Sequence, residues 1–284
     1  MKTGKKVFLA VLITALIGLL GFLGYGAFQA LQESGVLSPS SDVSSQPEEA
    51  PEEGSPPPGI LGSLPPAEVR ADVLDNLYFA FNKSKDAVGW IQIPGTDING
   101  LVMQAADNYY YERRNEDGDY DIYGCYFADY ECALGAREDF LQNTIIYGHG
   151  NSTDNPDGKR FSQLFRFTDP SFAKAHPYVY VSTMEGEFAF EIFSVFYTDT
   201  SFNYIQVEMD DGEKLALGQQ AQSLSLHDYG ITLQEDDRLL TLSTCSMVGD
   251  TDNTHRFVVM ARLCPEGTAE PLPEPASSED GSQE

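Results

Sequence analysis

The sequence predicts an all-β barrel with helical decoration, and three observations support this fold class. Short apolar segments follow one another with turn signals between them, helical periodicity is confined to a few segments, and 42% of the 284 residues are hydrophobic, including 17 Phe and 15 Tyr. Many short strands with few helices are typical of a closed barrel. The length suits one domain of about 200 residues with appendages.

Helical periodicity appears in three places along the chain. Apolar residues recur every four positions from Val69 to Phe81 and predict a helix over Ala67–Asn82. Aromatic and Leu residues within Phe161–Phe165 suggest a short helix, and the pattern of Asp211–Leu224 predicts a longer one.

Between these helices, strand signals dominate. Apolar runs bounded by turn residues predict strands at Val88–Ile93, Ile98–Met103, Gly124–Ala128, Asn143–His149, Tyr178–Thr183, Glu187–Tyr197, Arg238–Cys245 and Arg256–Leu263. The fifth and sixth strands are expected to form a hairpin across Met184-Glu185-Gly186.

The first 32 residues predict a membrane anchor. Residues 1–6 contain three lysines, and Val7–Gln32 carries no charge, which is longer than the roughly 20 apolar residues that cross a bilayer. A cleavable signal peptide is the alternative, but its apolar region is shorter and ends in an A-x-A-like site that this run lacks. The lysines predict a single-pass protein of the cell membrane, with a cytoplasmic N-terminus and the rest extracellular.

Two segments have the composition of flexible chain. Residues 33–66 are rich in Ser, Pro, Glu and Gly, and residues 265–284 carry acids and prolines but no base. Neither segment can bury enough apolar surface to offset the entropy of ordering. We expect a spacer over 33–66, a folded catalytic domain over 67–264, and an acidic tail over 265–284.

Charge and cysteine spacing exclude several function classes. The net charge of -27 argues against nucleic-acid binding. The four cysteines lack zinc-site spacing, although Cys125 and Cys132 are close enough in the chain for a local disulfide. The acidic loops 115–119 and 154–158 lack the full twelve-residue calcium pattern, so solvated turns are the better interpretation. We expect no metal and no cofactor.

Cys245 is the candidate nucleophile. It ends a predicted strand and precedes the polar loop 246–254, so its thiol lies where a buried strand reaches solvent. Reactive cysteines need partial exposure and an electropositive neighbour. On position alone, a buried structural cysteine is the commoner outcome.

Two further residues sit at similar strand ends. His149 closes the fourth strand before a polar stretch, and histidine suits proton transfer near neutral pH, although a lone histidine there is often only a polar residue. Arg256 begins the last strand, and a loop between antiparallel strands returns it toward Cys245. His255 competes with His149 as the partner because it neighbours Arg256.

Together these segments resemble the sortases, and class B sortases most closely. Leu242-Ser243-Thr244-Cys245 resembles that family's catalytic-cysteine strand, Asn143–His149 its catalytic-histidine strand, and Arg256–Val259 its catalytic-arginine strand. Three further stretches match in order, namely Asp97–Gln104, Asp107–Tyr111 and Gly124–Asp129. The helix-containing insert before the Cys245 strand suggests class B.

The resemblance implies a closed eight-stranded barrel and a cysteine transpeptidase. Cys245 would attack the Thr–Gly type bond of a C-terminal sorting signal on a secreted protein, and an amine of a cell-wall peptidoglycan precursor or a pilin would resolve the thioacyl-enzyme. His149 would move the protons, and Arg256 would hold the substrate backbone and the oxyanion. Substrate contacts are implied at Asn99, Met103, Thr200, Tyr204, Ile205, Ser243 and Thr244.

Some residues depart from the family pattern, and two other functions stay open. Gly150 stands where a larger residue is common, and the Gly150–Lys159 loop is longer and more polar than expected. An extracellular cysteine hydrolase using the same Cys–His pair would show no dependence on an amine. A non-catalytic membrane-tethered binding module would have an inert Cys245, or one bonded to Cys264.

Overall fold

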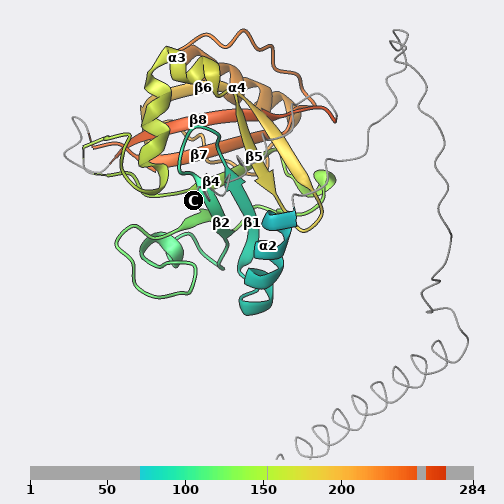
Figure 1. The fold of residues 1–284 in the computed structure, drawn as a ribbon. Helices are drawn as coiled ribbons and strands as arrows, with labels where there is room; N and C mark the ends of the chain where they lie inside the picture. The colour runs from blue at the N-terminus through green and yellow to red at the C-terminus, as the bar shows by residue number, and fades with distance from the viewer. Residues whose placement is uncertain (1–70, 152, 248–253, 267–284) are drawn as a thin grey trace, which may run out of the picture. The chain divides into compact units, whose positions relative to one another are not determined.

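Eight strands form a closed barrel in the computed structural model, which describes residues 71–151, 153–247 and 254–266. The strands are β1 (Ala87–Gln92), β2 (Asn99–Met103), β3 (Tyr126–Ala128), β4 (Asn143–Tyr147), β5 (Tyr178–Ser182), β6 (Glu187–Asp199), β7 (Leu239–Cys245) and β8 (His255–Leu263). They run around the barrel in the order β1-β2-β3-β4-β7-β8-β6-β5 (Figure 1). The predicted all-β barrel with helical decoration is confirmed.

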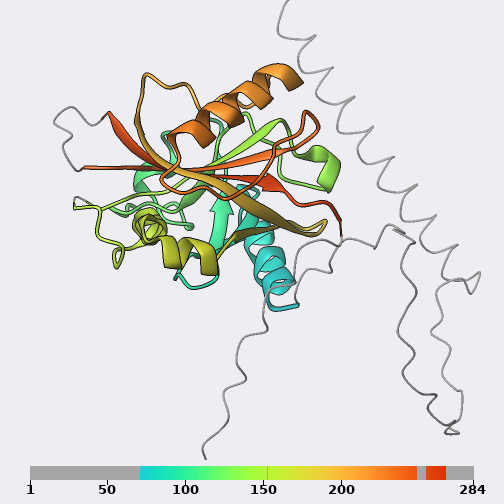
Figure 2. The ribbon, with the colours of Figure 1, turned by 90° about the horizontal axis from the view of Figure 1, so that it is seen from above.

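The helices lie outside this barrel. The α-helices are α2 (Ala71–Lys83), α3 (Pro170–Ala175) and α4 (Asp211–Leu224), and the 3₁₀ helices are η1 (Tyr111–Arg113), η2 (Arg137–Asp139) and η3 (Arg160–Thr168). Helix α2 packs beside β1, and α4 packs on β6 (Figures 1 and 2). The N-terminal segments expected over residues 1–66 lie outside the described residues.

Two parallel strand pairings determine which strand ends lie at the same edge of the barrel. β2 pairs with β3 and β4 pairs with β7 in parallel, whereas the other neighbours are antiparallel. In the β4–β7 ladder Asn143 lies opposite Leu239 and Tyr147 opposite Ser243. The carboxyl ends of β4 and β7 therefore reach the same edge of the barrel.

Strands β7 and β8 are buried on both faces. Leu240 and Leu242 point into the main core inside the barrel. Leu239 and Val258 belong to a second cluster, which the apolar side of α4 covers through Leu217 and Ala221. Because side chains alternate between the two faces of a strand, β7 and β8 contribute residues both to the core inside the barrel and to the cluster under α4. Burial on both sides fixes the register, since a slip by one residue would exchange the two layers.

Helix α4 begins where local chemistry predicts it. The Asp210 carboxylate accepts a hydrogen bond from the Glu213 N–H at 2.8 Å, and the Glu213 carboxylate accepts one from the Asp210 N–H at 3.2 Å. This reciprocal capping box satisfies donors that the first helical turn leaves free. The observed bounds equal the predicted ones.

Several of the observed elements differ from the predictions. The short helix expected within Phe161–Phe165 is the longer 3₁₀ helix η3. Helix α3 was not predicted, although Asp169 before Pro170 is a start signal and its carboxylate accepts from the Ser171 N–H. Strand β4 ends at Tyr147, so His149 lies in the loop rather than in the strand.

The prediction of a single-pass membrane protein is corrected here. None of the helices in the described ranges is long and apolar enough to cross a bilayer, and the longest α-helix among them, α4, has 14 residues. A span needs about 20 apolar residues. The segment 7–32 lies outside the described residues. The placement of the N-terminus in the cytoplasm and of the rest outside the cell depended on that anchor and is withdrawn with it.

In the described residues, the cysteine pair considered for a disulfide is not bonded, and the two acidic loops pair with arginines. Cys125 and Cys132 form no disulfide. In the loop 115–119, the Glu116 carboxylate pairs with Arg160 at 2.8 Å. In the loop 154–158, the Asp157 carboxylate pairs with Arg166 at 2.9 Å.

Gly124 offers a test of the packing beneath η1. Its φ is +55°, and an added Cβ would lie 2.6 Å from the Glu112 carbonyl oxygen and 2.7 Å from that of Tyr111. Gly230 is the matched control, because its φ is +66° but nothing lies within 4 Å of an added Cβ. We expect Gly230→Ala to lower the free energy of unfolding by about 1 kcal/mol and Gly124→Ala by about 2–3 kcal/mol, as measured by urea denaturation. Equal losses would contradict the packing argument.

Candidate active site

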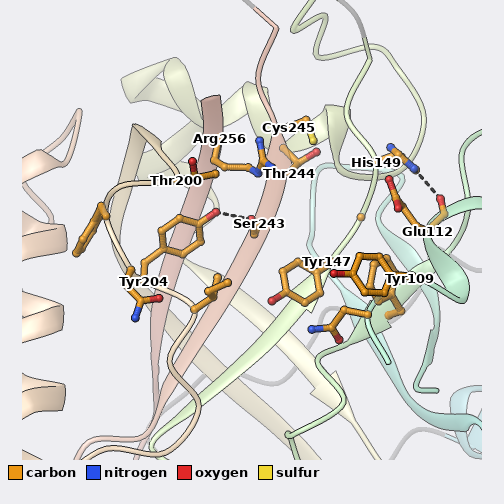
Figure 3. Close-up of a pocket in the computed structure, with 16 residues that line it drawn as sticks. Tyr109, Glu112, Tyr147, His149, Thr200, Tyr204, Ser243, Thr244, Cys245 and Arg256 are labelled. Atoms are coloured by element: carbon orange, nitrogen blue, oxygen red, sulfur yellow. Dashed lines mark hydrogen bonds between the residues drawn. The ribbon is translucent and has the colours of Figure 1, made fainter. Parts of the chain in front are cut away.

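A cavity of about 430 Å³ opens where β4 and β7 end. Its walls come from these strands, from the start of β8, from the segment around η1, and from the loop after β6. The lining residues are Asn108, Tyr109, Glu112, Phe127, Tyr147, Gly148, His149, Thr200, Phe202, Asn203, Tyr204, Ile205, Ser243, Thr244, Cys245 and Arg256 (Figure 3).

Cys245 and Arg256 are brought together by the antiparallel β7–β8 ladder, in which they are direct partners. Cys245 is half-buried, unlike the other three cysteines, which are buried. The Arg256 side chain donates from Nη1 to the His255 carbonyl at 2.8 Å. Figure 3 shows the guanidinium beside the end of the Cys245 strand. A thiol at a strand end thus faces the pocket with a fixed cation next to it.

His149 lies two residues beyond β4, on the same edge as Cys245. Its Nε2 is 2.6 Å from the Glu112 carbonyl oxygen (Figure 3). A carbonyl oxygen can only accept, so Nε2 carries the proton and Nδ1 is the basic nitrogen of the neutral ring. Burial lowers the pKa of His149, and the positive charge of Arg113 lowers it further. The imidazole is therefore neutral near pH 7 and able to accept a proton.

Gly150 lets the loop after His149 approach the Cys245 strand. An added Cβ would lie 2.6 Å from the Cys245 carbonyl oxygen and 2.9 Å from Thr244 Oγ1. No side chain fits at such distances without moving the strand end. The close approach explains why glycine stands where a larger residue was expected.

Asp154 joins the loop after His149 to the loop after Cys245. Its carboxylate accepts from the Ser246 hydroxyl at 2.6 Å and from the Met247 N–H at 2.9 Å. The residue has a φ of +51°, a left-handed conformation that Asp and Asn adopt more readily than most residues. The long polar loop noted in the sequence therefore fixes the end of the Cys245 strand.

The wall formed by the loop after β6 is held by a buried amide. Asn143 Nδ2 donates to the Tyr204 carbonyl at 3.1 Å and to the Gln206 carbonyl at 2.9 Å, and its Oδ1 accepts from the Thr241 hydroxyl at 2.7 Å. The Tyr204 hydroxyl bonds to Ser243 Oγ at 2.9 Å. Burial raises the pKa of Tyr204, which keeps this hydroxyl neutral.

The opposite wall is organised by the carboxylate of Asp129. Asn108 Nδ2 donates to it at 2.7 Å, and the Tyr147 hydroxyl donates to the same oxygen at 2.8 Å. Burial, with the nearby carboxylate, raises the pKa of Tyr147. Tyr109 follows Asn108 and is 80% exposed, so this wall carries an aromatic ring at its rim.

The pocket contains eight of the ten site residues expected from the sequence. These are Cys245, His149, Arg256, Thr200, Tyr204, Ile205, Ser243 and Thr244. Asn99 and Met103 on β2 are not among the lining residues. Met103 is 1% exposed within a core cluster, and Asn99 accepts a hydrogen bond from Trp90 Nε1 at 2.6 Å. His255, the competing histidine, does not line the pocket either.

Sequence reasoning missed the η1 wall and part of the loop after β6. The residues concerned, with three at β3 and the end of β4, are Asn108, Tyr109, Glu112, Phe127, Tyr147, Gly148, Phe202 and Asn203. A signal existed for Tyr147, which precedes His149 by two residues at the end of the same apolar run. Asn108 and Tyr109 lie in a stretch that matched the family, but nothing in that stretch indicated which way it faces.

The arrangement has the components of nucleophilic acyl transfer. A half-exposed thiol can attack a carbonyl carbon, a neutral imidazole can take up and return a proton, and a guanidinium can hydrogen-bond to a developing oxyanion. The neutral hydroxyls of Tyr204 and Ser243 add polar anchors to a largely apolar wall. Such a wall suits an extended peptide.

Comparison with known proteins gives concordant results. A family profile described as "Sortase domain" matches residues 91–264. Sortase B of Listeria monocytogenes is 32% identical over 196 residues, which cover 69% of this chain and 76% of that protein. The structure of the Staphylococcus aureus sortase B–substrate complex matches with a TM-score of 0.60 at 27% identity, covering 68% of this chain and 86% of the other. A sortase B complexed with triglycine matches with a TM-score of 0.61 at 27% identity, covering 69% and 88%.

The electrostatic setting of His149 can be tested through Arg113. We expect His149 to titrate below its ordinary pKa of 6.5, as followed by NMR of the imidazole protons. Arg113→Gln should raise the pKa because it removes the repelling cation, whereas Arg113→Lys, which keeps the charge, should change it much less. An unchanged pKa in Arg113→Gln would refute the contribution of Arg113.

The lowered pKa of His149 also determines how the free energy of unfolding depends on pH. Because the folded-state pKa of His149 lies below the unfolded value, its contribution to stability is present above the unfolded pKa. That contribution is lost as the pH falls through the folded pKa.

The Asp154 contacts can be tested with Asp154→Gly, since glycine tolerates the left-handed backbone. The variant leaves the buried Ser246 hydroxyl and the Met247 N–H without their acceptor. We expect a loss of about 1–3 kcal/mol in unfolding free energy and faster hydrogen exchange at the Met247 amide. Asp157→Ala in the same loop should cost less than about 1 kcal/mol, because its ion pair is exposed. Unaltered exchange at Met247 would contradict the role of Asp154.

Proposed function

The chain belongs to the sortase family and is a cysteine transpeptidase of class B type, and we propose that it cleaves a C-terminal sorting signal on secreted proteins. The bond cleaved is of the Thr–Gly type, and the acyl part is joined to an amine. One observation carries the assignment of residues, namely that Cys245, Arg256 and His149 line one cavity at the shared edge of β4, β7 and β8.

In the first half-reaction, Cys245 acts as the nucleophile. His149 Nδ1 takes the thiol proton, and Sγ attacks the carbonyl carbon of the scissile bond. Arg256 hydrogen-bonds to the oxygen that gains negative charge. When the C–N bond breaks, His149 returns its proton to the leaving amine, and a thioester to Cys245 remains. The neutral state of the imidazole supports this order of proton transfers.

In the second half-reaction, an amine resolves the thioester. The amine loses a proton to His149, attacks the thioester carbonyl and forms the new amide bond. The C–S bond breaks, and Cys245 regains a proton. We propose a peptidoglycan precursor or a pilin as the source of the amine. The likeness to a sortase B complexed with triglycine supports an acceptor with a primary amine.

The acyl part of the substrate is expected along the wall formed by the loop after β6. Thr200, Tyr204 and Ile205 line this wall, and Ser243 and Thr244 line the adjoining strand. Ile205 is 43% exposed, so it offers apolar surface to a peptide. The matching fold of a sortase B–substrate complex supports a peptide ligand in this groove.

Cys245→Ala provides the test of the proposal. It should abolish the covalent thioacyl-enzyme detected by mass spectrometry, while circular dichroism shows an intact fold. Cys264→Ala is the control, because that thiol is buried and does not line the pocket. A sorting-signal peptide selected from a library for Cys245-dependent cleavage serves as substrate. Peptide joining by Cys245→Ala would refute the proposal.

The same assay separates transpeptidation from the two alternatives. Product partition between water and added amine should favour the amine product as its concentration rises. A pure hydrolase would release only the hydrolysed peptide at every amine concentration. A binding module would form no thioacyl-enzyme in the wild type.

A further inference from the structure

The charges that line the pocket are unevenly distributed. Among the lining residues, Glu112 is the only carboxylic acid, whereas Arg256 is a permanent cation. The two lie on opposite sides, with the Cys245 strand end and His149 between the walls that carry them (Figure 3). The lining therefore has a cation next to the peptide wall and a carboxylate at η1, while the Arg113 guanidinium of η1 acts on His149 from outside the lining.

The backbone of Glu112 is hydrogen-bonded to His149. Its carbonyl oxygen accepts the hydrogen bond from His149 Nε2 at 2.6 Å. The turn beneath it is packed closely, because Gly124 leaves no room for a Cβ against the Glu112 carbonyl. The carboxylate on the same residue thus has a fixed anchor beside the imidazole, and Figure 3 shows it next to the His149 ring.

The Glu112 carboxylate makes no hydrogen bond or ion pair with any described residue, whereas its acidic neighbours have partners. Glu116 pairs with Arg160, Asp117 pairs with Lys83, and Asp107 accepts from the Tyr109 N–H. Among the acids of this segment, Glu112 is the one that lines the pocket, and its acceptor oxygens are available there. An exposed carboxylate at a pocket wall is suited to a cationic ligand.

We propose that Glu112 binds the ammonium group of the acceptor and holds it next to His149 for the second half-reaction. This inference rests on the proposed function and adds a residue that selects the acceptor. A primary amine is protonated near pH 7 and must lose a proton before it can attack. Glu112 receives the R–NH₃⁺ form, His149 Nδ1 takes one proton, and the resulting R–NH₂ attacks the thioester as the C–S bond breaks. The imidazolium then gives its proton to the Cys245 thiolate, and the nitrogen of the new amide releases its surplus proton to water.

The placement has a consequence for acceptor chemistry. The ammonium group of a lysine side chain, or of the amino end of a glycine peptide, has no free carboxylate on the neighbouring carbon. An amine with an adjacent free carboxylate, as in free glycine, brings a negative charge near Glu112 and is disfavoured by repulsion. The site therefore selects cationic acceptors that have no free carboxylate next to the ammonium group.

The experiment compares Glu112→Gln with the wild type and with Asp119→Asn, an acid-to-amide change in the loop after η1 that does not line the pocket. Thioacyl formation from the sorting-signal peptide is measured first without amine. The rate of thioester resolution is then measured against the concentration of glycinamide, which is cationic, and of hydroxylamine, which is uncharged near neutral pH.

Because Glu112 also acts on His149, we expect Glu112→Gln to change acylation and hydroxylamine resolution by one small common factor. The effect of the lost carboxylate on the ammonium is the change with glycinamide beyond that common factor. The KM for glycinamide should rise about 5- to 10-fold, as is typical of losing one partly exposed charge-assisted contact. Added salt should raise the glycinamide KM of the wild type but not that of the variant. Asp119→Asn should behave as the wild type.

Two outcomes would overturn the inference, and a third concerns the function. An unchanged KM for glycinamide in Glu112→Gln shows that the carboxylate does not bind the ammonium. Equal losses with glycinamide and hydroxylamine show that the variant has disturbed His149 instead. If the wild type itself forms no thioacyl-enzyme with any peptide, the proposed function fails, and the inference fails with it.

Discussion

The parallel pairing of β4 with β7 is the constraint on which the rest of the site depends. Parallel neighbours end at the same edge, so the loop that carries His149 and the strand end that carries Cys245 leave the barrel side by side. The antiparallel return of β8 adds Arg256 opposite Cys245. Burial of β7 on both faces prevents a shift of register, because a slip would place the core residues Leu240 and Leu242 in the outer layer.

The strand pairing brings Cys245 and His149 to the same edge of the barrel, and further contacts then fix their positions. Gly150 lies against the Cys245 carbonyl, and the Asp154 carboxylate holds the residues that follow Cys245. On the other side, the Glu112 carbonyl orients the His149 ring and determines which nitrogen is basic. The thiol and the imidazole are thus positioned mostly by backbone groups, which cannot change rotamer.

The barrel could be predicted from local strand and turn signals, and the structure brings Cys245, His149 and Arg256 to one pocket. The catalytic roles of these three residues come from the family resemblance and stay predictions. Strand ends next to polar loops indicate where side chains reach solvent, and Asp210 with Glu213 defines the start of α4. The η1 wall could not be predicted, because Glu112 reaches the pocket through contacts between distant segments. Met103 illustrates the converse, since its place in a matched stretch suggested a groove, whereas the structure buries it in a core cluster. The anchor prediction rested on composition alone.

The contacts of Asn143 with the groove wall have a consequence for how substrate preference can change. This amide holds the carbonyl oxygens of Tyr204 and Gln206, not their side chains. The path of the wall is therefore fixed by Asn143 on β4 and by the Tyr204–Ser243 hydrogen bond, while the exposed side chain of Ile205 contributes surface to the groove. Substitutions along this wall can alter which peptides fit while the scaffold stays in place, so recognition and architecture can diverge independently.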